Sequence, residues 1–294
     1  MDSRKLLTNI AIFLKMIKVE HTVFALPFAY VGAILVEKNI PSTSDLIWIT
    51  LAMIGARTAA MCLNRIIDKH IDARNPRTAD RALPRGLISL KSVWIYTLLS
   101  ITLLLIATLN LSDLAFKLFP VALFMLFFYP YTKRFTWFCH LFLGVTLALA
   151  PIGAWVAIAN SIDTGILVLG FGVMFWVAGF DIVYACSDYD FDKRHGIHSI
   201  PARFGITNAL YISRIFHIIT IILLTITGVV FGLGILYFIG ILLSTMLLLH
   251  GHRAIKKFFE SGEKKSQKEI SHFFELNGIL SMAVFIFTWI DITI

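Results

Sequence analysis

Charge and cysteine are both scarce in this sequence. Only 15% of the 294 residues are Asp, Glu, Lys or Arg, against about 25% in an ordinary soluble domain. The three cysteines are scattered and form no CxxC pair, which argues against a disulfide framework and against a zinc site. Because no polar stretch is long enough to form a soluble core of its own, the sequence predicts a single membrane domain over residues 1–294.

The first residues do not have the order of a cleaved signal peptide. The apolar segment Leu6–Leu14 is short, Lys15 and Lys18 follow it, and there is no cleavage site of small residues. We expect an amphipathic helix on the cytoplasmic membrane surface instead.

Apolar residues are what the sequence has in excess. They make up 58% of the chain, and the mean hydropathy is +0.81. Nine apolar runs approach the length of about 20 residues that a transmembrane helix needs. This pattern predicts an all-α, polytopic membrane protein with nine transmembrane helices. The runs are Val19–Val36, Leu46–Ile66, Val93–Leu111, Leu114–Tyr131, Trp137–Ala159, Ile166–Ala185, Ala209–Val230, Gly232–His250 and Phe273–Ile290.

Basic residues set the expected orientation. The connections after the second, fourth, sixth and eighth runs are long or basic, and such loops stay in the cytoplasm. Only Lys38 and Lys117 then lie near the outer face, and Arg57 lies within a run. Membrane orientation therefore explains the net charge of +8, and we expect no nucleic-acid partner. Similar loops four runs apart suggest two four-helix halves plus a ninth helix.

Two acidic stretches end apolar runs on this cytoplasmic side. Asn64, Asp68 and Asp72 recur every four residues, so they share one helix face. The second stretch contains Asp188 and Asp192. The C-terminal end of a helix disfavours carboxylates unless a cation joins them. Oxygen ligands without a Cys or His cluster suit a hard cation such as Mg²⁺, whose shell is commonly completed by substrate phosphates.

Basic side chains gather on the same side, and Arg and Lys are the usual contacts of phosphate oxygens. The sequence therefore supports a diphosphate site at the membrane surface, with apolar helices behind it for a lipid tail. The basic residues are Arg65, Lys69, Arg77, Arg81, Lys133, Arg134, Lys193, Arg194 and Arg203.

Asp181 lies two helical turns deeper than Asp188, or roughly 10 Å at about 1.5 Å per residue. A lone Asp inside a membrane is a functional candidate. The alternative is a buried polar group that a neighbouring Tyr or Arg satisfies.

Four motifs resemble those of the UbiA family of intramembrane aromatic prenyltransferases, in the family's order and over nearly the whole chain. Asn64–Asp72 resembles the motif NDxxDxxxD, and Arg77–Gly86 resembles the loop RTxxRPLPxG that follows it. Tyr129–Arg134 resembles YPxxKR. Asp181–Asp192, followed by Gly196–Ser199, resembles DxxYAxxDxxxD and then GIKS.

The resemblance implies that a polyprenyl group passes from a polyprenyl diphosphate to an aromatic ring, with Mg²⁺ as the cofactor. It implies that Mg²⁺ is held by Asn64, Asp68, Asp72, Asp188 and Asp192. The implied catalytic residues are these four aspartates and Asp181, which would position the acceptor or help ionisation. Tyr131 would shield the allylic cation, although an aromatic residue at a helix end is also typical of an interfacial anchor. The implied substrate-binding residues are Arg65, Arg77, Arg81, Tyr131, Lys133, Arg134 and His198.

Two positions depart from the family pattern. Arg65 stands where the family has an Asp, which removes one metal ligand and adds a phosphate contact unless the side chain points away. His198 stands where GIKS has its Lys, and a His binds phosphate only when it is protonated. The chain is similar to a branch described as 4-hydroxybenzoate polyprenyltransferase-like.

The expected function is therefore prenylation of an aromatic carboxylic acid of the 4-hydroxybenzoate type in ubiquinone or menaquinone biosynthesis. A dihydroxynaphthoate acceptor in menaquinone biosynthesis is the alternative within this class. The expected partners are a polyprenyl diphosphate, the aromatic acid and membrane lipid, in a bacterial inner membrane with the active site on the cytoplasmic side. Other classes to weigh are a secondary transporter, another lipid-phosphate enzyme with Asp-rich motifs, and acidic stretches that are merely solvated loop ends.

Overall fold

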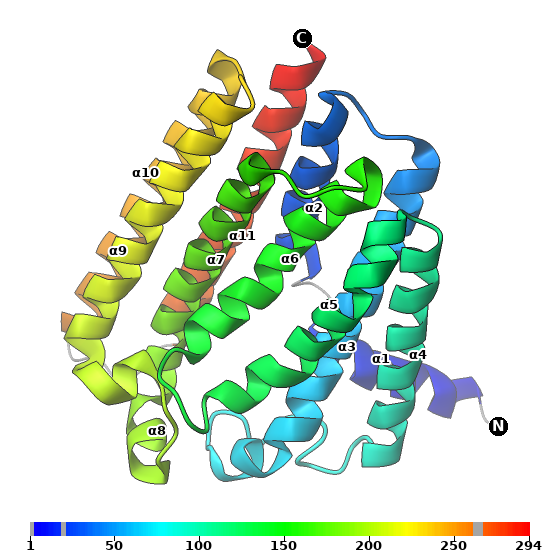
Figure 1. The fold of residues 1–294 in the computed structure, drawn as a ribbon. Coiled ribbons are helices and arrows are strands. Elements are labelled where there is room, and N and C mark those ends of the chain that lie inside the picture. The colour runs from blue at the N-terminus through cyan, green and yellow to red at the C-terminus, as the bar shows by residue number, and fades with distance from the viewer. Residues whose placement is uncertain (1–2, 19–21, 261–266) are drawn as a thin grey trace.

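The computed structural model describes residues 3–18, 22–260 and 267–294, and these form helices and turns with no strand. The all-α architecture is confirmed (Figure 1). The helices are α1 (Ser3–Ile17), α2 (Thr22–Glu37), α3 (Thr43–Arg74), α4 (Leu90–Leu109), α5 (Asp113–Thr132), α6 (Cys139–Ala159), α7 (Thr164–Ala185), α8 (Tyr189–His195), α9 (Ile200–Val230), α10 (Ile235–Glu260) and α11 (Gln267–Thr293), with a 3₁₀ turn η2 (Cys186–Asp188) between α7 and α8.

Eight helical segments in the described part of the chain are long and apolar enough to cross a membrane. They correspond to eight of the nine expected runs. The remaining run, Val19–Val36, corresponds to α2, whose described apolar part Ala25–Glu37 is shorter, while residues 19–21 lie outside the described residues. The polytopic membrane protein expected from the sequence is therefore confirmed.

Two helices extend well beyond the apolar runs from which they were predicted. α3 continues to Arg74, eight residues past the end of the run Leu46–Ile66, so the first acidic motif is fully helical. α9 begins at Ile200 rather than near Ala209, because the side chain of Ser199 accepts a hydrogen bond from the Ala202 N–H at its start. A kink follows at Gly205, whose φ is 80°, a value that glycine adopts readily because it has no Cβ.

The helices pack closely where small residues meet neighbouring backbone. An added Cβ on Gly32 of α2 would lie 2.2 Å from the Pro151 carbonyl oxygen of α6. On the other side of α6, an added Cβ on Gly144 would lie 2.3 Å from the Met174 carbonyl oxygen of α7. α2 and α5 both pack against α6, so the two expected four-helix groups are in contact, and the expected ninth helix, α11, packs against α2 and α10.

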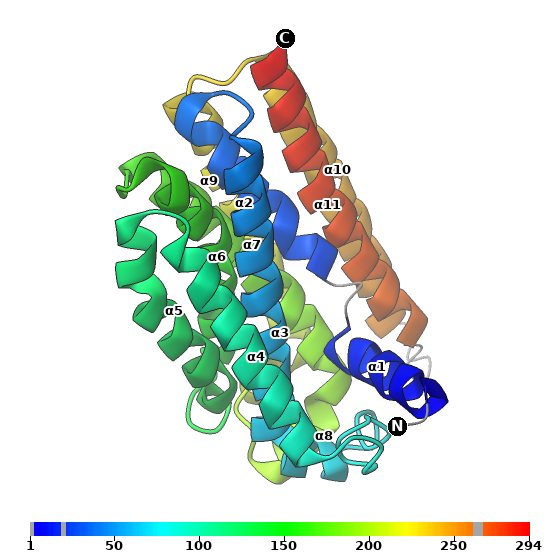
Figure 2. The ribbon, with the colours of Figure 1, turned by 90° about the vertical axis from the view of Figure 1, so that its right-hand side faces the viewer.

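Both acidic stretches lie at one end of the bundle. In Figure 1 the end of α3, the loop that follows it and α8 gather at the lower end of the molecule. Figure 2 shows α1 lying across the bundle near the same end, while the C-terminus lies at the opposite end. The fold thus brings polar segments that are far apart in the sequence to one side of an apolar bundle.

The close approach of α2 and α6 generates a prediction about stability. Gly32→Ala forces a Cβ against the backbone of Pro151, which cannot rotate away, so we expect a loss of about 1–3 kcal/mol. The measurement is thermal unfolding of the purified protein in detergent. The control is Gly153→Ala on α6, because a Cβ there meets nothing within 4 Å. Equal unfolding temperatures for the two variants would contradict this packing.

Candidate active site

The first acidic motif forms one wall of a polar cavity. Asn64, Asp68 and Asp72 all line it from the last turns of α3, as their four-residue spacing predicted. The Asn64 amide donates a hydrogen bond of 3.2 Å to Oδ2 of Asp68. Asp68 and Asp72 are almost completely buried, at 1% and 4% exposure. Buried carboxylates are unstable unless they are paired, so their partners decide how the site is built.

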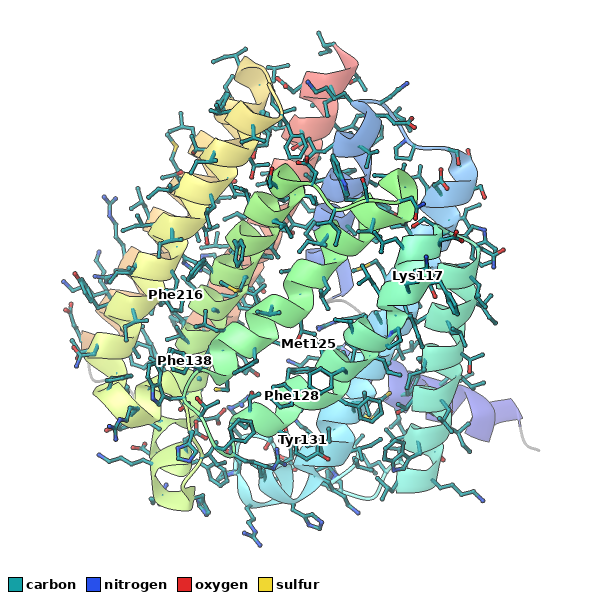
Figure 3. The ribbon with its side chains drawn as sticks, in the orientation of Figure 1. Lys117, Met125, Phe128, Tyr131, Phe138 and Phe216 are labelled. Carbon is teal, nitrogen blue, oxygen red and sulfur yellow. The ribbon has the colours of Figure 1, made fainter. Side chains whose placement is uncertain are left out.

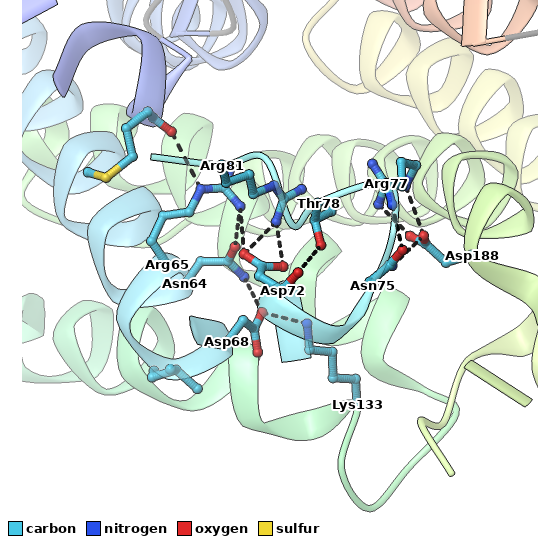
Figure 4. A network of polar contacts seen from close by, with 12 residues as sticks. Asn64, Arg65, Asp68, Asp72, Asn75, Arg77, Thr78, Arg81, Lys133 and Asp188 are labelled. Atoms are coloured by element: carbon cyan, nitrogen blue, oxygen red, sulfur yellow. Dashed lines mark hydrogen bonds and ion pairs between the residues drawn. The ribbon is translucent and has the colours of Figure 1, made fainter. Parts of the chain in front are cut away.

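The loop after α3 supplies the partner of Asp72. Arg81 donates from Nη1 to both carboxylate oxygens of Asp72, at 2.7 Å each. Thr78 holds the loop in place by donating from its hydroxyl to the Asp72 carbonyl at 3.0 Å. The loop therefore folds back over the motif that precedes it, as Figure 4 shows.

The same loop reaches the second acidic stretch. Arg77 binds Asp188 through both carboxylate oxygens, with the Nε–Oδ1 distance at 2.8 Å, and also donates to the Tyr184 hydroxyl at 2.7 Å. Asn75 donates to Oδ1 of Asp188 at 2.7 Å. Two segments more than a hundred residues apart are thus tied together by charged hydrogen bonds (Figure 4).

The connection between α5 and α6 adds a third set of charges. The Lys133 ammonium pairs with Oδ2 of Asp68, and Nη2 of Arg134 lies 3.2 Å from Oδ1 of the same carboxylate. The backbone N–H of His198 donates to the Lys133 carbonyl at 2.8 Å. Asp192 accepts a hydrogen bond of 2.9 Å from the Ser199 hydroxyl, so the segment after α8 closes the far side of the cavity.

The surroundings shift the pKa values of two basic residues, Arg77 in the loop and Lys18 after α1, in opposite directions. Burial lowers the pKa of Arg77, but the hydrogen bonds to Asp188 raise it more, so the guanidinium stays charged. Lys18 follows α1, and burial lowers its pKa; Tyr184 opposes this shift, while the positive charges of Arg65 and Arg81 lower the pKa further.

The donor set suits a hard cation but is not a ready-made metal cage. Within the described residues no three His, Cys, Asp or Glu side chains are placed to hold one metal ion. The carboxylates are instead paired with basic side chains, Asp68 with Lys133, Asp72 with Arg81 and Asp188 with Arg77. Mg²⁺ is commonly bound by one or two carboxylates while substrate phosphates fill its remaining positions. Residues of this kind fit a metal that arrives with a diphosphate, because the basic side chains would then turn to the phosphate oxygens.

Most of the residues predicted from the sequence line this one cavity, and three do not. The residues along it are Asn64, Asp68, Asp72, Arg77, Arg81, Lys133, Asp181, Asp188, Asp192 and His198. Arg134 reaches Asp68 from outside the lining, and its guanidinium lies 5.2 Å from the ring centre of Tyr131. Tyr131 is 46% exposed near Phe128 at the end of α5 (Figure 3). It lies on the surface of the bundle and is not among the residues that line the cavity.

Arg65 is buried behind the cavity rather than in it. Its Nε donates to the Met16 carbonyl of α1 at 3.4 Å, and its Nη1 lies 3.8 Å from Oδ2 of Asp72. Nη1 also donates to Oδ1 of Asn64 at 3.4 Å. The residue that departs from the family pattern therefore joins α1 to the first acidic motif.

One buried residue, His140, and one half-buried residue, Arg57, were not predicted as site residues. His140, the second residue of α6, lies 2.6 Å from Asp181 through Nδ1, so the partner of Asp181 is a histidine rather than the Tyr or Arg that was the alternative. Arg57 lies two turns before Asn64 and lines an adjacent apolar cavity. Its position seven residues before Asn64, on the same helix face, was the available signal.

The two cavities adjoin along α3, α5 and α6. On α6 the lining changes from Leu147 of the apolar cavity to Leu143 of the polar one. Going one turn along α3, the lining changes from Ala60 of the apolar cavity to Asn64 of the polar one. On α5 it changes from Leu126 to Tyr129, and the Tyr129 hydroxyl donates to the Ala60 carbonyl at 3.2 Å. A charged head and an apolar tail of one molecule therefore fit side by side.

The fold and the site define a polytopic helical membrane protein with a charged cavity that adjoins an apolar one. A model of the UbiA prenyltransferase family matches residues 25–277. The chain belongs to this family and is a prenyltransferase.

Characterised relatives agree with this assignment. The chain is 30% identical over 224 residues to 4-hydroxybenzoate octaprenyltransferase of Vibrio cholerae, covering 76% of this chain and 78% of the relative. A similar relative of the same description from Francisella tularensis is 29% identical over 225 residues, covering 76% of this chain and 78% of the relative.

Solved structures share the fold. The apo structure of a UbiA homolog from Aeropyrum pernix has a TM-score of 0.83 at 31% identity, covering 92% of this chain and 98% of that one. A UbiA homolog from Archaeoglobus fulgidus bound to GPP and Mg²⁺ has a TM-score of 0.70 at 21% identity, covering 96% and 100%.

The position of Arg65 generates a prediction. Arg65→Asp removes the contact with α1 and places a second acid beside buried Asp72, so we expect a loss of about 3 kcal/mol or more. We also expect faster amide hydrogen exchange in α1. The control is Lys69→Asp, which makes the same charge change one turn further along α3. If both variants matched the wild type in α1 exchange and unfolding temperature, the proposed link between α1 and α3 would be wrong.

Proposed function

We propose that the protein transfers a polyprenyl group from a polyprenyl diphosphate to an aromatic carboxylic acid of the 4-hydroxybenzoate type, with Mg²⁺ as the cofactor. One observation carries the proposal: two acidic motifs and the basic side chains that neutralise them line a single cavity that adjoins an apolar one. The relatives named as octaprenyltransferases support the reaction, and the homolog bound to GPP and Mg²⁺ supports the cofactor. Ubiquinone or menaquinone biosynthesis is the proposed route.

The proposed metal ligands all line the polar cavity, which supports this role. When bound there, Mg²⁺ would neutralise the negative charge that develops on the departing diphosphate. Arg77, Arg81 and Lys133 are proposed to leave their carboxylate partners and bind the phosphate oxygens, with Arg134 behind them. His198 would add a contact only when protonated. The proposed ligands are Asn64, Asp68, Asp72, Asp188 and Asp192.

The prenyl tail is proposed to occupy the apolar cavity among α2, α3, α4, α5 and α6. Its lining is rich in alanine and leucine, including Ala52, Ala56 and Leu104. Such a chamber excludes water, which would otherwise capture the allylic cation. Tyr129 lies where the two cavities meet, and we propose that the bond that breaks lies beside it.

The acceptor is proposed to bind between Arg57 and Asp181. Nε of Arg57 is buried and has no hydrogen-bond partner among the described residues, so a carboxylate would satisfy it. Asp181 lines the polar cavity and would accept a hydrogen bond from a ring hydroxyl. A dihydroxynaphthoate also carries a carboxylate and hydroxyls, and it is the second acceptor that these two residues suit.

We also propose that residues 1–294 form one membrane domain and that the site faces the cytoplasm of a bacterial inner membrane. The support is the concentration of basic residues at the end of the bundle where the cavity opens, because basic segments stay on the cytoplasmic side.

The test is a membrane assay with a labelled polyprenyl diphosphate and either 4-hydroxybenzoate or a dihydroxynaphthoate. We expect prenylated product with Mg²⁺ and none after chelation with EDTA. Asp188→Asn should abolish turnover, because it removes a proposed metal ligand. The matched control is Asp190→Asn, an exposed residue of the same stretch outside the cavity, which should keep its activity.

Two outcomes would count against the proposal. Absence of product with either acceptor in the presence of Mg²⁺ would overturn the reaction. Full activity of Asp188→Asn would overturn the metal assignment while leaving prenyl transfer intact.

A further inference from the structure

His140 is a buried histidine with both ring nitrogens bonded at the wall of the site. It is 2% exposed, and its Nδ1 lies 2.6 Å from Oδ2 of Asp181. The backbone N–H of Ile200 donates to Nε2 at 3.2 Å. Because His140 begins α6, Asp181 lies on α7 and Ile200 begins α9, one imidazole ring connects three helices beside the cavity.

These contacts fix where the hydrogen of the ring lies. A backbone N–H can only donate, so Nε2 of His140 must accept with its lone pair. A neutral imidazole then carries its hydrogen on Nδ1 and donates it to Oδ2 of Asp181. Oδ2 of Asp181 therefore accepts the hydrogen bond from His140. The other oxygen, Oδ1, has no hydrogen-bond partner among the described residues, and the side chain lines the cavity with 27% of its surface exposed.

The start of α9 explains why Ile200 is available for this role. The first N–H groups of a helix have no partner within it, and the Ile200 N–H is satisfied by the His140 ring. The preceding residue, Ser199, donates to Oδ2 of Asp192 at 2.9 Å. Two consecutive residues thus orient Asp192 directly and Asp181 through His140.

We propose that His140 is a positioning residue that fixes Oδ2 of Asp181 and leaves Oδ1 turned toward the ring hydroxyl of the aromatic acceptor. This inference rests on the proposed function and deepens it by assigning the hydroxyl its contact. In the reaction, the prenyl C–O bond to diphosphate breaks, a bond forms to a ring carbon, and the proton on that carbon leaves to solvent. The hydroxyl, by donating to Oδ1, makes the attacking ring carbon richer in electrons.

The test compares two substitutions in the full-length protein in lipid nanodiscs. His140→Leu keeps a branched side chain of similar length but cannot donate to Asp181, so we expect kcat to fall about 100-fold. Mg²⁺-dependent binding of the prenyl diphosphate, measured by calorimetry, should stay unchanged. His140→Asn carries an amide N–H close to the position of Nδ1, so it should recover kcat to within about 10-fold of the wild type.

His217→Leu is the matched control. His217 is another buried histidine with both nitrogens bonded, to the Trp176 carbonyl at 3.2 Å and to His252 at 2.8 Å, but it lies outside the cavity. This variant should unfold at a lower temperature and keep its kcat per folded molecule. A fall in kcat that is specific to His140 then separates positioning from general destabilisation.

Several results would overturn the inference. These are a His140→Leu variant within twofold of wild-type kcat, a parallel loss of prenyl diphosphate binding, and a His140→Asn variant as slow as His140→Leu. If the wild type transfers no prenyl group to an aromatic acid, the proposed function and this inference both fail. An active wild type with an unaffected His140→Leu variant overturns this inference alone.

Discussion

The contact between Arg77 and Asp188 is the interaction on which the site depends. It joins the loop after α3 to the 3₁₀ turn η2 that follows α7. Asn75 donates a further hydrogen bond to Asp188, and Arg77 donates one to Tyr184. Charged hydrogen bonds of this kind are strong in a partly buried setting, where water cannot replace them. Without this contact Asp188 would keep only the Asn75 hydrogen bond to the loop, and its negative charge would have no basic partner.

The carboxylates of the first acidic motif are also paired with basic side chains. Carboxylates at helix C-termini are disfavoured by the helix dipole and by their mutual repulsion. Here Asp72 is paired with Arg81, and Asp68 with Lys133. In the free protein, the negative charges of these carboxylates are therefore neutralised by neighbouring basic side chains. A metal ion is positive and a diphosphate is negative. When both bind, the carboxylates would pair with the metal and the basic side chains with the phosphate oxygens, so the total charge in the cavity would stay balanced.

The sequence predicted the features that depend only on the geometry of a single helix. The spacing of Asn64, Asp68 and Asp72 placed them on one face, and the apolar runs predicted the transmembrane helices. The direction of Arg65 could not be predicted, because it depends on where α1 packs. The contact between His140 and Asp181 depends on how α6 lies against α7, and no spacing within either helix encodes it.

A double-mutant cycle on Arg77→Gln and Asp188→Asn tests the central claim most directly. The measurement is the thermal unfolding of the two single variants and the double variant in the same detergent. If the two side chains hold the motifs together, the effects are not additive, and the double variant unfolds close to the less stable single variant, with a coupling of about 1.5 kcal/mol or more. Losses of stability that simply add would contradict the account, because they would mean that the two residues act independently.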